Sequence, residues 1–493
     1  MGISVGIDLG TTNSLCCSLI DGEFKFLSFR GGSQLLPSSL LYYDGKMTVG
    51  DMARKKSVLY SENYISSSKT FIGDSTKKWV LDDRHFNATD VATEVLSYIK
   101  KEIEKQFNFK SESGSEFESN KKISAVITVP AYFTANQIDE TKKAGEQSGF
   151  FVKQIIPEPV AAGIAYGFED NINEKIAVID IGGGTFDISL LEASGNSYST
   201  LAIDGDNKLG GNNFDDIILE MCFRQIRKTV GIDLSSFESS RLSKSDYSQA
   251  KQRLILEAEH KKIELSSAEK VSIDIPNLFN KNNYVFHTEI SRIQFEDAAS
   301  PLIKRIERKI ENCLREAAVN NVNNIHKVIL VGGTSYIPKI QNCIQDYFNQ
   351  APYSDKDLSK LVAMGAAIIA DDVSTVEIRD KISHSLGIRL LGGKFYPLLK
   401  KNEIYPISVS KVFPYRGKNS ENFFLKIYEG EDDCVANNEF YGSLNLKGIA
   451  DLTAGKPKIQ VTFSFNKNRI LEIKAKNVAS GDQKTKSIQV HKE

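Results

Sequence analysis

Short hydrophobic runs separated by glycine-containing turns recur along residues 1–371 of this 493-residue chain. Residues 5–20 read as a buried strand, a turn at 10–13 and a return strand. Residues 176–191 repeat this order, with the turn at 182–185. Apolar runs bounded by glycine are typical of buried strands, and a tight turn between two of them is typical of a hairpin. The pattern predicts two similar hairpins, one in each half of this region.

A second pair of segments repeats in the same way. Residues 125–129 form an apolar run that leads into Pro130 and a helical pattern, and residues 327–331 form one that leads into Gly332, Gly333 and a helical pattern. Two copies of one α/β unit are expected to fold as two lobes with a cleft between them. Apolar residues at three- and four-residue spacing predict helices at 90–106, 134–148, 212–229, 241–265 and 295–318.

The pattern changes near residue 372, beyond which no long helical period is present. Short segments of alternating apolar and polar residues follow, and they predict a small antiparallel β-sandwich. We therefore divide the chain into an α/β domain at 1–371, a polar linker at 372–384 and an all-β domain at 385–493. The expected strands are 385–391, 407–413, 423–428, 440–446, 458–465 and 470–475, with a last strand around Ile488.

Composition narrows the class of protein further. The hydrophobic fraction of 41% and the charged fraction of 25% are typical of a soluble globular protein. A formal net charge of -1 gives no overall field to attract nucleic acid or an anionic membrane. The six cysteines are scattered without a C-x-x-C pair, which suits packing in a reducing compartment. With no membrane-spanning segment and no secretory signal in the sequence, we expect a cytoplasmic protein.

The first hairpin turn is suited to binding phosphate. Gly10 allows a tight turn and a close approach of the backbone to a ligand. Thr11 and Thr12, followed by Asn13, provide hydroxyl and amide donors for phosphate oxygens. Asp8, at the end of the preceding strand, can hold a hydrated magnesium ion. One such turn is weak evidence, because similar turns also serve as plain hairpins.

The second hairpin repeats this chemistry, and two facing hairpins could grip a triphosphate from both sides. Gly332, Gly333 and Thr334 lie between a strand and a helix, where the backbone can approach a sugar or a purine. A tight structural turn is the alternative interpretation of that glycine pair. The residues of the second hairpin that match the first, with one further carboxylate, are Asp180, Gly182, Gly183, Gly184, Thr185 and Asp187.

Taken in order, these motifs resemble those of the heat-shock protein 70 (DnaK-type) chaperone family, within the actin, sugar kinase and chaperone ATPase superfamily. The resemblance covers essentially the whole chain. It implies an actin-like, two-lobed α/β ATPase domain followed by an all-β sandwich that binds substrate. The motifs are IDLGTTNS at 7–14, VPAYF at 129–133, EP at 158–159, DIGGGTFDI at 180–188, LGG at 209–211, FD at 214–215 and VGGT at 331–334.

Residues 31–73 are similar to the HscA branch of the family, which assists iron–sulfur cluster assembly. The similarity is carried by LLPS at 35–38, VGDMAR at 49–54 and ISSSK at 65–69. It implies an iron–sulfur scaffold protein as the client. The family continues into a helical lid, which we expect to be missing here because the chain ends at Glu493. A lidless protein and a truncated chain remain equally open.

The resemblance implies roles for residues around the phosphates of ATP or ADP. Lys69 matches a catalytic lysine near the γ-phosphate, where an ammonium can orient water and offset developing charge. Glu158 and Asp180 match residues that hold Mg²⁺ mostly through its water shell, and Asp8 completes this acidic group. Asp187 matches a carboxylate that helps to place the ion or the attacking water. Thr185, Thr11 and Thr12 match phosphate contacts.

The resemblance also implies contacts to adenosine from the helix at 241–265. Glu259, Lys262 and Ser267 match residues that reach the nucleoside, although a solvated helix face with ordinary ion pairs is the alternative for Glu259 and Lys262. Ile263 and Tyr336 stand where many relatives have arginines that stack on adenine. We expect Tyr336 to stack on the purine and Ile263 to pack on its other face.

The linker departs most from the family pattern of a short leucine run that ends in aspartate. The matching stretch here is 376–380, and it carries Glu377 and Arg379 at apolar positions. Burying an unpaired charge in a groove costs several kcal/mol, roughly. We therefore expect the linker to dock more weakly than in relatives.

In the sandwich, Leu391, Phe413 and Phe423 fall at positions that line the family's peptide channel. A larger ring at Phe423 than in relatives should alter peptide choice. Packing of all three in the core of the sandwich is the alternative interpretation. Without a lid, peptide would leave faster, since most differences in affinity lie in the dissociation rate.

We therefore predict a monomeric, ATP-hydrolysing chaperone that binds extended apolar peptide, works with a J-domain co-chaperone and has no nucleic-acid or membrane partner. Two alternatives remain open. A nucleotide-binding co-chaperone or scaffold with little hydrolysis is favoured by the charged linker and the missing lid, and is opposed by Lys69 and the carboxylates. A small-molecule kinase of the same superfamily is opposed by the C-terminal sandwich.

Overall fold

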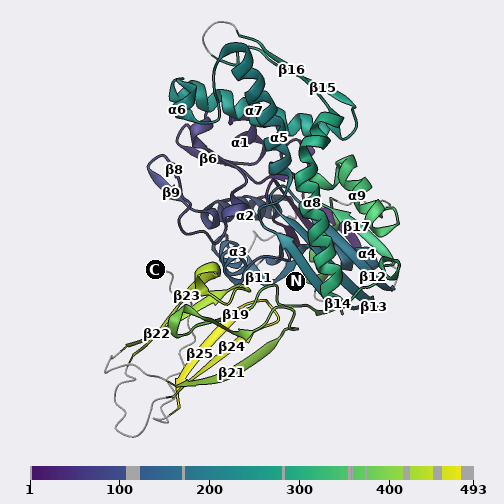
Figure 1. The fold of residues 1–493 in the computed structure, drawn as a ribbon, viewed down its shortest axis with the longest axis vertical. Coiled ribbons are helices and arrows are strands. Elements are labelled where there is room, and N and C mark those ends of the chain that lie inside the picture. The colour runs from purple at the N-terminus through teal and green to yellow at the C-terminus, as the bar shows by residue number, and fades with distance from the viewer. Residues whose placement is uncertain are drawn as a thin grey trace, which may run out of the picture.

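The computed structural model describes residues 3–106, 123–168, 172–279, 284–353, 357, 359–371, 375–414, 422–447 and 458–478. Figure 1 shows two α/β lobes above a small β-sandwich, which confirms the predicted fold class. None of the helices in these ranges is long and apolar enough to cross a membrane.

Each lobe is built around one mixed sheet, and the two sheets have the same strand arrangement. In the first, β10 lies parallel to β1, and β2 and β3 continue antiparallel; in the second, β17 lies parallel to β12, and β13 and β14 continue antiparallel. This confirms the predicted duplication. The strands of the first sheet are β1 (Ser4–Asp8), β2 (Asn13–Ile20), β3 (Glu23–Phe26), β10 (Ser124–Val129) and β11 (Phe151–Pro157), with β4 (Leu36–Pro37) beside β2; those of the second are β12 (Asn173–Ile181), β13 (Phe186–Ser194), β14 (Ser197–Asp206), β17 (Lys327–Val331) and β18 (Glu377–Arg379).

The five predicted helices form within a few residues of their expected bounds. Helix α3 begins where expected because Thr134 caps it, accepting from the Gln137 N–H while the Gln137 side chain accepts from the Thr134 N–H. Helix α5 ends at Gly231, whose positive φ of 71° suits glycine at a helix C-terminus. The helices are α1 (Asp51–Lys56), α2 (Ala88–Gln106), α3 (Ala135–Gln147), α4 (Glu158–Gly167), α5 (Gly211–Val230), α6 (Phe237–Ser240), α7 (Lys244–Leu265), α8 (Arg292–Glu316), α9 (Pro338–Phe348) and α10 (Leu361–Ala370).

The two lobes meet at their base through α4 and α10, both rich in buried small and apolar residues. The helices lie so close that a Cβ added to Gly365 would fall 1.8 Å from the carbonyl oxygen of Ala161. Smaller sheets extend the lobes away from this base. They are β5 (Leu40–Tyr43), β6 (Lys46–Val49) and β7 (Tyr64–Ile65), the pair β8 (Trp79–Leu81) and β9 (Arg84–Phe86), and the pair β15 (Lys270–Ile275) and β16 (Phe286–Ser291).

The all-β domain is a sandwich of a four-stranded and a three-stranded sheet around one apolar core. The six expected strands within the described residues are confirmed, and the predicted strand around Ile488 lies outside them. Strand β20 was not predicted, because Pro397 interrupts its pattern; proline is tolerated there because β20 is an edge strand. The sheets contain β20 (Phe395–Leu399), β19 (Leu386–Arg389), β22 (Asn422–Glu429) and β23 (Glu439–Lys447), and β21 (Ile407–Pro414), β24 (Lys458–Phe465) and β25 (Leu471–Asn477).

The linker does not bury its charges, so the reason for expecting weak docking was wrong. Residues 377–379 form β18, which pairs in parallel with β14 and extends the second sheet. Because side chains alternate along a strand, Glu377 and Arg379 both point to solvent, where they form an ion pair of 3.1 Å. Ile378 packs against the apolar core between the lobes.

Asp380 follows β18 and is fully buried between the two domains. Its carboxylate accepts from the hydroxyl of Thr200 on β14 and from that of Tyr405 in the sandwich, both at 2.6 Å. The sandwich also packs against the start of α3, where the Glu429 carboxylate accepts from the Ala135 N–H at 2.9 Å. Tyr441 donates to Asp139 at 2.6 Å on the same helix. These contacts dock the sandwich on the α/β domain.

Candidate functional site

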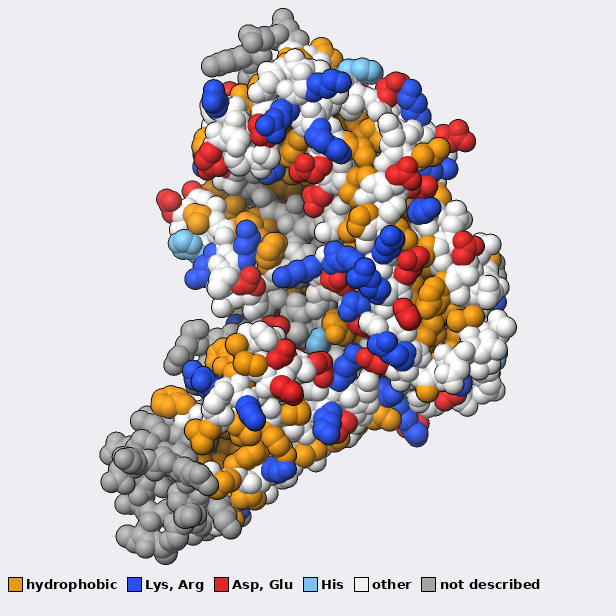
Figure 2. All heavy atoms as spheres, in the orientation of Figure 1, with side chains coloured by type: hydrophobic (Ala, Val, Ile, Leu, Met, Phe, Trp, Pro, Cys, Tyr) orange, Lys and Arg blue, Asp and Glu red, His pale blue; other side chains and the backbone are white. Residues whose placement is uncertain are grey.

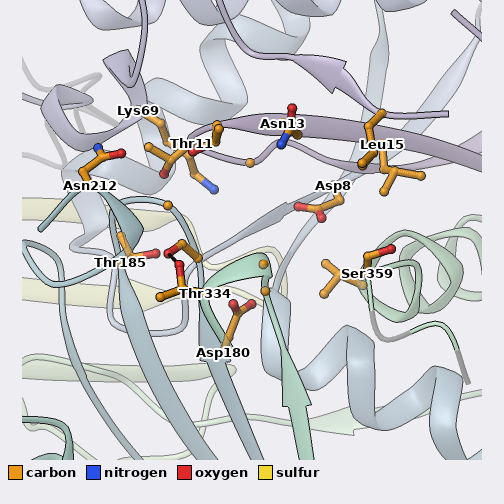
Figure 3. Close-up of a pocket in the computed structure, with 18 of the residues that line it drawn as sticks. Asp8, Thr11, Asn13, Leu15, Lys69, Asp180, Thr185, Asn212, Thr334 and Ser359 are labelled. Carbon is orange, nitrogen blue, oxygen red and sulfur yellow. Dashed lines mark hydrogen bonds between the residues drawn. The ribbon is translucent and has the colours of Figure 1, made fainter. Parts of the chain in front are cut away.

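A cavity of about 210 Å³ lies between the lobes and is lined by both predicted hairpin turns. Figure 3 shows Asp8, Thr11 and Asn13 of the first turn facing Asp180 and Thr185 of the second across this space. The predicted cleft with mirrored turns is therefore present.

The two turns approach each other closely, which explains their glycines. A Cβ added to Gly183 would lie 2.0 Å from the hydroxyl oxygen of Thr12, and one added to Gly184 would lie 2.3 Å from the methyl group of Thr70. Gly10 is equally crowded, since an added Cβ would lie 2.1 Å from the Asn13 carbonyl oxygen. A side chain at Gly183 or Gly184 would have to displace the side chain of Thr12 or Thr70, and one at Gly10 would have to displace the backbone of Asn13.

Lys69 and Glu158 form a buried ion pair at one end of the cavity. The Lys69 Nζ lies 2.7 Å from Glu158 Oε1, and both side chains are more than nine-tenths buried. Lys69 comes from the short 3₁₀ segment η3 (Ser68–Phe71), and Glu158 is the first residue of α4. Loss of either partner would leave a buried charge unpaired, which is strongly unfavourable.

Three aspartates lie near this ion pair; Asp180 and Asp187 are buried, and Asp8 is partly buried. Burial, together with the nearby Glu158, raises the pKa of Asp8 to about 7, although Lys69 opposes the change. The same causes raise the pKa of Asp180 well above its usual range. For Asp187, burial and Glu158 raise the pKa to about 7, opposed by the N–H of Tyr132, by Lys69 and by Arg469.

The donor chemistry fits a hydrated divalent cation. Carboxylates that repel one another in an apolar surrounding gain most from a cation with a water shell. Asp187 Oδ2 is buried and has no hydrogen-bond partner among the described residues, so it can accept from a bound water. Among those residues no three His, Cys, Asp or Glu are grouped closely enough to hold a metal directly. Asp8, Glu158 and Asp180 are the residues that would hold such a cation, through its water shell.

The other end of the cavity is lined from α7 and from the turn after β17. Glu259, Lys262 and Ile263 face it from α7, and Gly332, Gly333 and Thr334 face it from the turn at the end of β17. Lys262 is buried, and its Nζ lies 2.8 Å from Asp215 Oδ1, so the solvated-face alternative is wrong for this residue. Thr334 donates to the Gly182 carbonyl at 2.8 Å and ties this turn to the second hairpin.

Most predicted site residues line this cavity, but four do not. Asp187 is completely buried beside the cavity, and Gly184 lines a neighbouring cavity of about 570 Å³ together with Thr70. Ser267 and Tyr336 line neither cavity, so their predicted contacts with the nucleoside stay a prediction. Ser267 donates to the Glu264 carbonyl at the end of α7, and Tyr336 is 48% exposed at the end of its 3₁₀ turn.

Several lining residues were not predicted as site residues. Asp215 belongs to the FD motif at 214–215, and its position one turn after the start of α5 could have identified it as a site residue. Ser359 and Val362 come from the region before and at the start of α10, where the sequence carries no local motif. The unpredicted lining residues are Leu15, Leu35, Asn212, Asp215, Ser359 and Val362.

Above the cavity, the lobes are linked by polar contacts along α7. Arg54 on α1 forms an ion pair with Glu259 at 2.8 Å, and Glu62 forms one with Lys244 at 2.8 Å. Glu259 therefore takes part both in the cavity wall and in closing the cleft. These contacts cross from the first lobe to the second.

The predicted peptide-contact residues have different environments in the sandwich. Leu391 is 84% exposed at the end of the edge hairpin, whereas Phe413 is partly buried with its ring 5.5 Å from that of Tyr396. Phe423 lies in β22, and its side chain is outside the described residues. Figure 2 shows hydrophobic side chains gathered on this face of the sandwich. Exposed large apolar residues of the domain include Leu391, Val412, Phe424 and Phe440.

The fold and the site together define a class: a two-lobed, actin-like nucleotide-binding ATPase joined to a β-sandwich. The family model described as "Hsp70 protein" matches residues 4–493. The chain is 35% identical to a protein named "Chaperone protein DnaK" from Mycoplasmoides gallisepticum, over 99% of this chain and 80% of the relative. It is 33% identical to a "Chaperone protein DnaK" from Halobacterium salinarum, over 98% of this chain and 75% of the relative. The chain belongs to the Hsp70 family of ATP-dependent chaperones.

Proposed function

We propose that this chain hydrolyses Mg-ATP in the interlobe cleft and binds extended apolar segments of unfolded clients with its sandwich, in cooperation with a J-domain co-chaperone. One observation supports the chemistry above all others. Two glycine-dependent turns, the Lys69–Glu158 pair, Asp8 and Asp180 line a single cavity, and Asp187 is buried beside it. Fixed donors aimed at a polyphosphate in a water-poor site are what phosphoryl transfer requires.

Each group has a proposed role. The turn amides with Thr11, Thr12 and Thr185 hold the phosphates. Lys69 offsets the charge that develops on the γ-phosphate and orients the attacking water, and Asp187 accepts a hydrogen bond from that water. Bound Mg²⁺ would neutralise phosphate charge, and Asp8, Glu158 and Asp180 would hold its water shell.

The decisive test is single-turnover hydrolysis with Lys69→Ala. We expect the rate to fall by about a hundredfold or more, because removal of one charge-stabilising group usually has that effect. Mg-ATP affinity, measured by calorimetry, should change much less. Lys78→Ala is the matched control, because Lys78 is an exposed lysine in the loop that follows η3. A wild-type chain that binds Mg-ATP without hydrolysing it would contradict the proposal and establish the scaffold alternative.

A narrower proposal concerns the client protein, the cellular location and the oligomeric state. The similarity of residues 31–73 to the HscA branch supports an iron–sulfur scaffold protein as client. We also propose that the chaperone is cytoplasmic and monomeric. Fluorescence anisotropy can compare a labelled scaffold-protein peptide with an unrelated apolar peptide of equal length. Equal affinities for the two would contradict the iron–sulfur role while leaving the ATPase proposal intact. Sedimentation velocity measures the oligomeric state directly.

A further inference from the structure

One short segment of the first lobe contacts both the catalytic groups and the sandwich. On the cleft side, the Tyr132 N–H donates to Asp187 Oδ1 at 2.8 Å, and the Phe133 ring centre lies 5.5 Å from the Lys69 Nζ. On the other side, Ser383 donates to the Phe133 carbonyl at 3.1 Å, and the Ala135 N–H donates to Glu429. Residues 131–135 are therefore held from both directions.

Arg469 approaches this segment from the sandwich. It lies in the turn between β24 and β25, which is fixed by the Asn466 side chain accepting from the N–H groups of Asn468 and Ile470. Its φ of 61° is uncommon for a residue with a side chain. The guanidinium Nη2 donates to the Ala131 carbonyl at 3.2 Å, next to the residue whose N–H binds Asp187.

Burial makes Arg469 unusual. Only 1% of the residue is exposed, and Nε and Nη1 have no hydrogen-bond partner among the described residues. Burying a charged group with unsatisfied donors costs free energy, and a turn of this kind does not need an arginine. Lys467, two residues earlier in the same turn, is exposed as a surface turn residue ordinarily is. The cost at Arg469 is understandable if its contact with Ala131 has a function.

We propose that Arg469 is a positioning residue for ATP hydrolysis: through the Ala131 carbonyl it holds the Tyr132 N–H against Asp187 while the sandwich is docked. The inference rests on the proposed role of Asp187 in the reaction. Arg469 touches neither nucleotide nor reacting water. It acts by fixing the backbone that orients the carboxylate, so its loss should affect the hydrolysis step and spare ATP binding.

The first measurement is single-turnover hydrolysis by the full chain at saturating Mg-ATP. Arg469→Met should slow hydrolysis about tenfold while the Kd for Mg-ATP stays within about twofold, the split expected when only transition-state geometry is lost. Arg469→Lys, which keeps a charged donor, should recover part of the rate. Lys467→Met is the matched control on the same turn and should hydrolyse like the wild type. A wild-type rate for Arg469→Met would overturn the proposal.

The second measurement is amide hydrogen exchange, which does not depend on hydrolysis. The Tyr132 amide reports positioning, and the Ala135 amide, bound to Glu429, reports docking. Arg469→Met should speed exchange at Tyr132 and leave Ala135 protected, and Asp187→Ala should also speed exchange at Tyr132. Equal loss of protection at both amides would show that Arg469 merely docks the sandwich, and unchanged exchange at both would show no role; either result overturns the proposal. A wild type without hydrolysis would refute the proposed function, and exchange would still decide the role of Arg469.

Discussion

The two phosphate hairpins share a backbone course but differ at one matched pair of positions. Asp8 and Asp180 occupy the same place at the ends of β1 and β12. Opposite them in register stand Leu15 in the first hairpin and Asp187 in the second. The first hairpin therefore presents an apolar side chain to the cavity where the second places a buried carboxylate. The duplicated hairpins can contact the phosphates from both sides of the cavity. Because only the second hairpin has a carboxylate at this position, only that hairpin can place the attacking water.

A second matched pair diverges in the same manner. The segment after β10 carries Tyr132 and Phe133 toward the docked sandwich, whereas the equivalent segment after β17 carries Gly333 and Thr334 into the cavity wall. One copy of the unit thus connects the site with the second domain, and the other completes the nucleotide pocket. The segments after β10 and β17 therefore hold equivalent positions in the two repeats but have different functions.

The strongest test of the hairpin comparison replaces the two matched residues. Asp187→Asn should reduce single-turnover hydrolysis by about a hundredfold or more, because it removes a charge at the proposed water position. Leu15→Val should leave hydrolysis within about threefold and lower stability by about 1 kcal/mol, as shortening a buried side chain usually does. Rapid-quench kinetics and thermal unfolding provide the two readouts. Equal loss of rate in both variants would remove the claimed asymmetry.

Substitutions at the turn glycines test whether the close approach of the two turns is needed for nucleotide binding. Gly183→Ala should weaken Mg-ATP binding by about tenfold or more, since its Cβ meets Thr12 in the opposite turn. Gly182→Ala is the comparison variant in the same cavity-lining turn: its Cβ would meet no protein atom closer than 3.7 Å, so it adds a methyl group without the clash with the opposite turn. Titration calorimetry measures both affinities. If the two alanine variants bound equally well, the close approach of the turns would not matter for nucleotide.

His384, at the interface with the sandwich, should make the stability of the protein depend on pH. Burial, followed by the positive charges of Lys401, Lys309 and Arg469, lowers the pKa of His384 to about 3. The folded protein therefore keeps this histidine neutral, while the unfolded chain protonates it below pH 6.5, so stability is lost as the pH falls from 6.5 toward 3.

His384→Gln should remove that loss. Relative to the variant, the wild type should lose about 2 kcal/mol of unfolding free energy between pH 7 and pH 5, from 1.36 kcal/mol per pH unit below 6.5. Denaturant unfolding at the two pH values provides the measurement. A difference between the two proteins that does not change with pH would show that His384 titrates normally in the folded state.

The smallest expected effect concerns closure of the cleft. Arg54→Ala removes the ion pair with Glu259, a partly exposed pair of the kind worth about 0.2–1 kcal/mol. Nucleotide release, followed by stopped-flow fluorescence of a labelled ADP, should become about two- to fivefold faster. Lys55→Ala, an exposed neighbour on the same helix, should release nucleotide like the wild type. Added salt should speed release from the wild type more than from Arg54→Ala.

Local pattern predicted the elements and the phosphate turns, and it failed where distant parts of the chain decide the outcome. The hairpins at Asp8 and Asp180 have strong local signatures, so both their structure and their convergence could be predicted. The outward orientation of Glu377 and Arg379 could not, because it depends on which edge strand the linker joins. Tyr336 shares a turn with the cavity residues Gly333 and Thr334, yet it is 48% exposed and does not line the cavity. Nothing local to Arg469 indicates that it reaches Ala131 across the domain interface.

Asp380 should make separation of the two domains cooperative. Its one carboxylate satisfies a hydroxyl from each domain, and it is fully buried only while both are present. If the domains separated, Asp380 would keep a hydrogen bond to only one of the two hydroxyls, and its carboxylate would become exposed to water. A hydrogen bond to an exposed carboxylate contributes little to stability. The two domains should therefore part in a single step, without a populated halfway state.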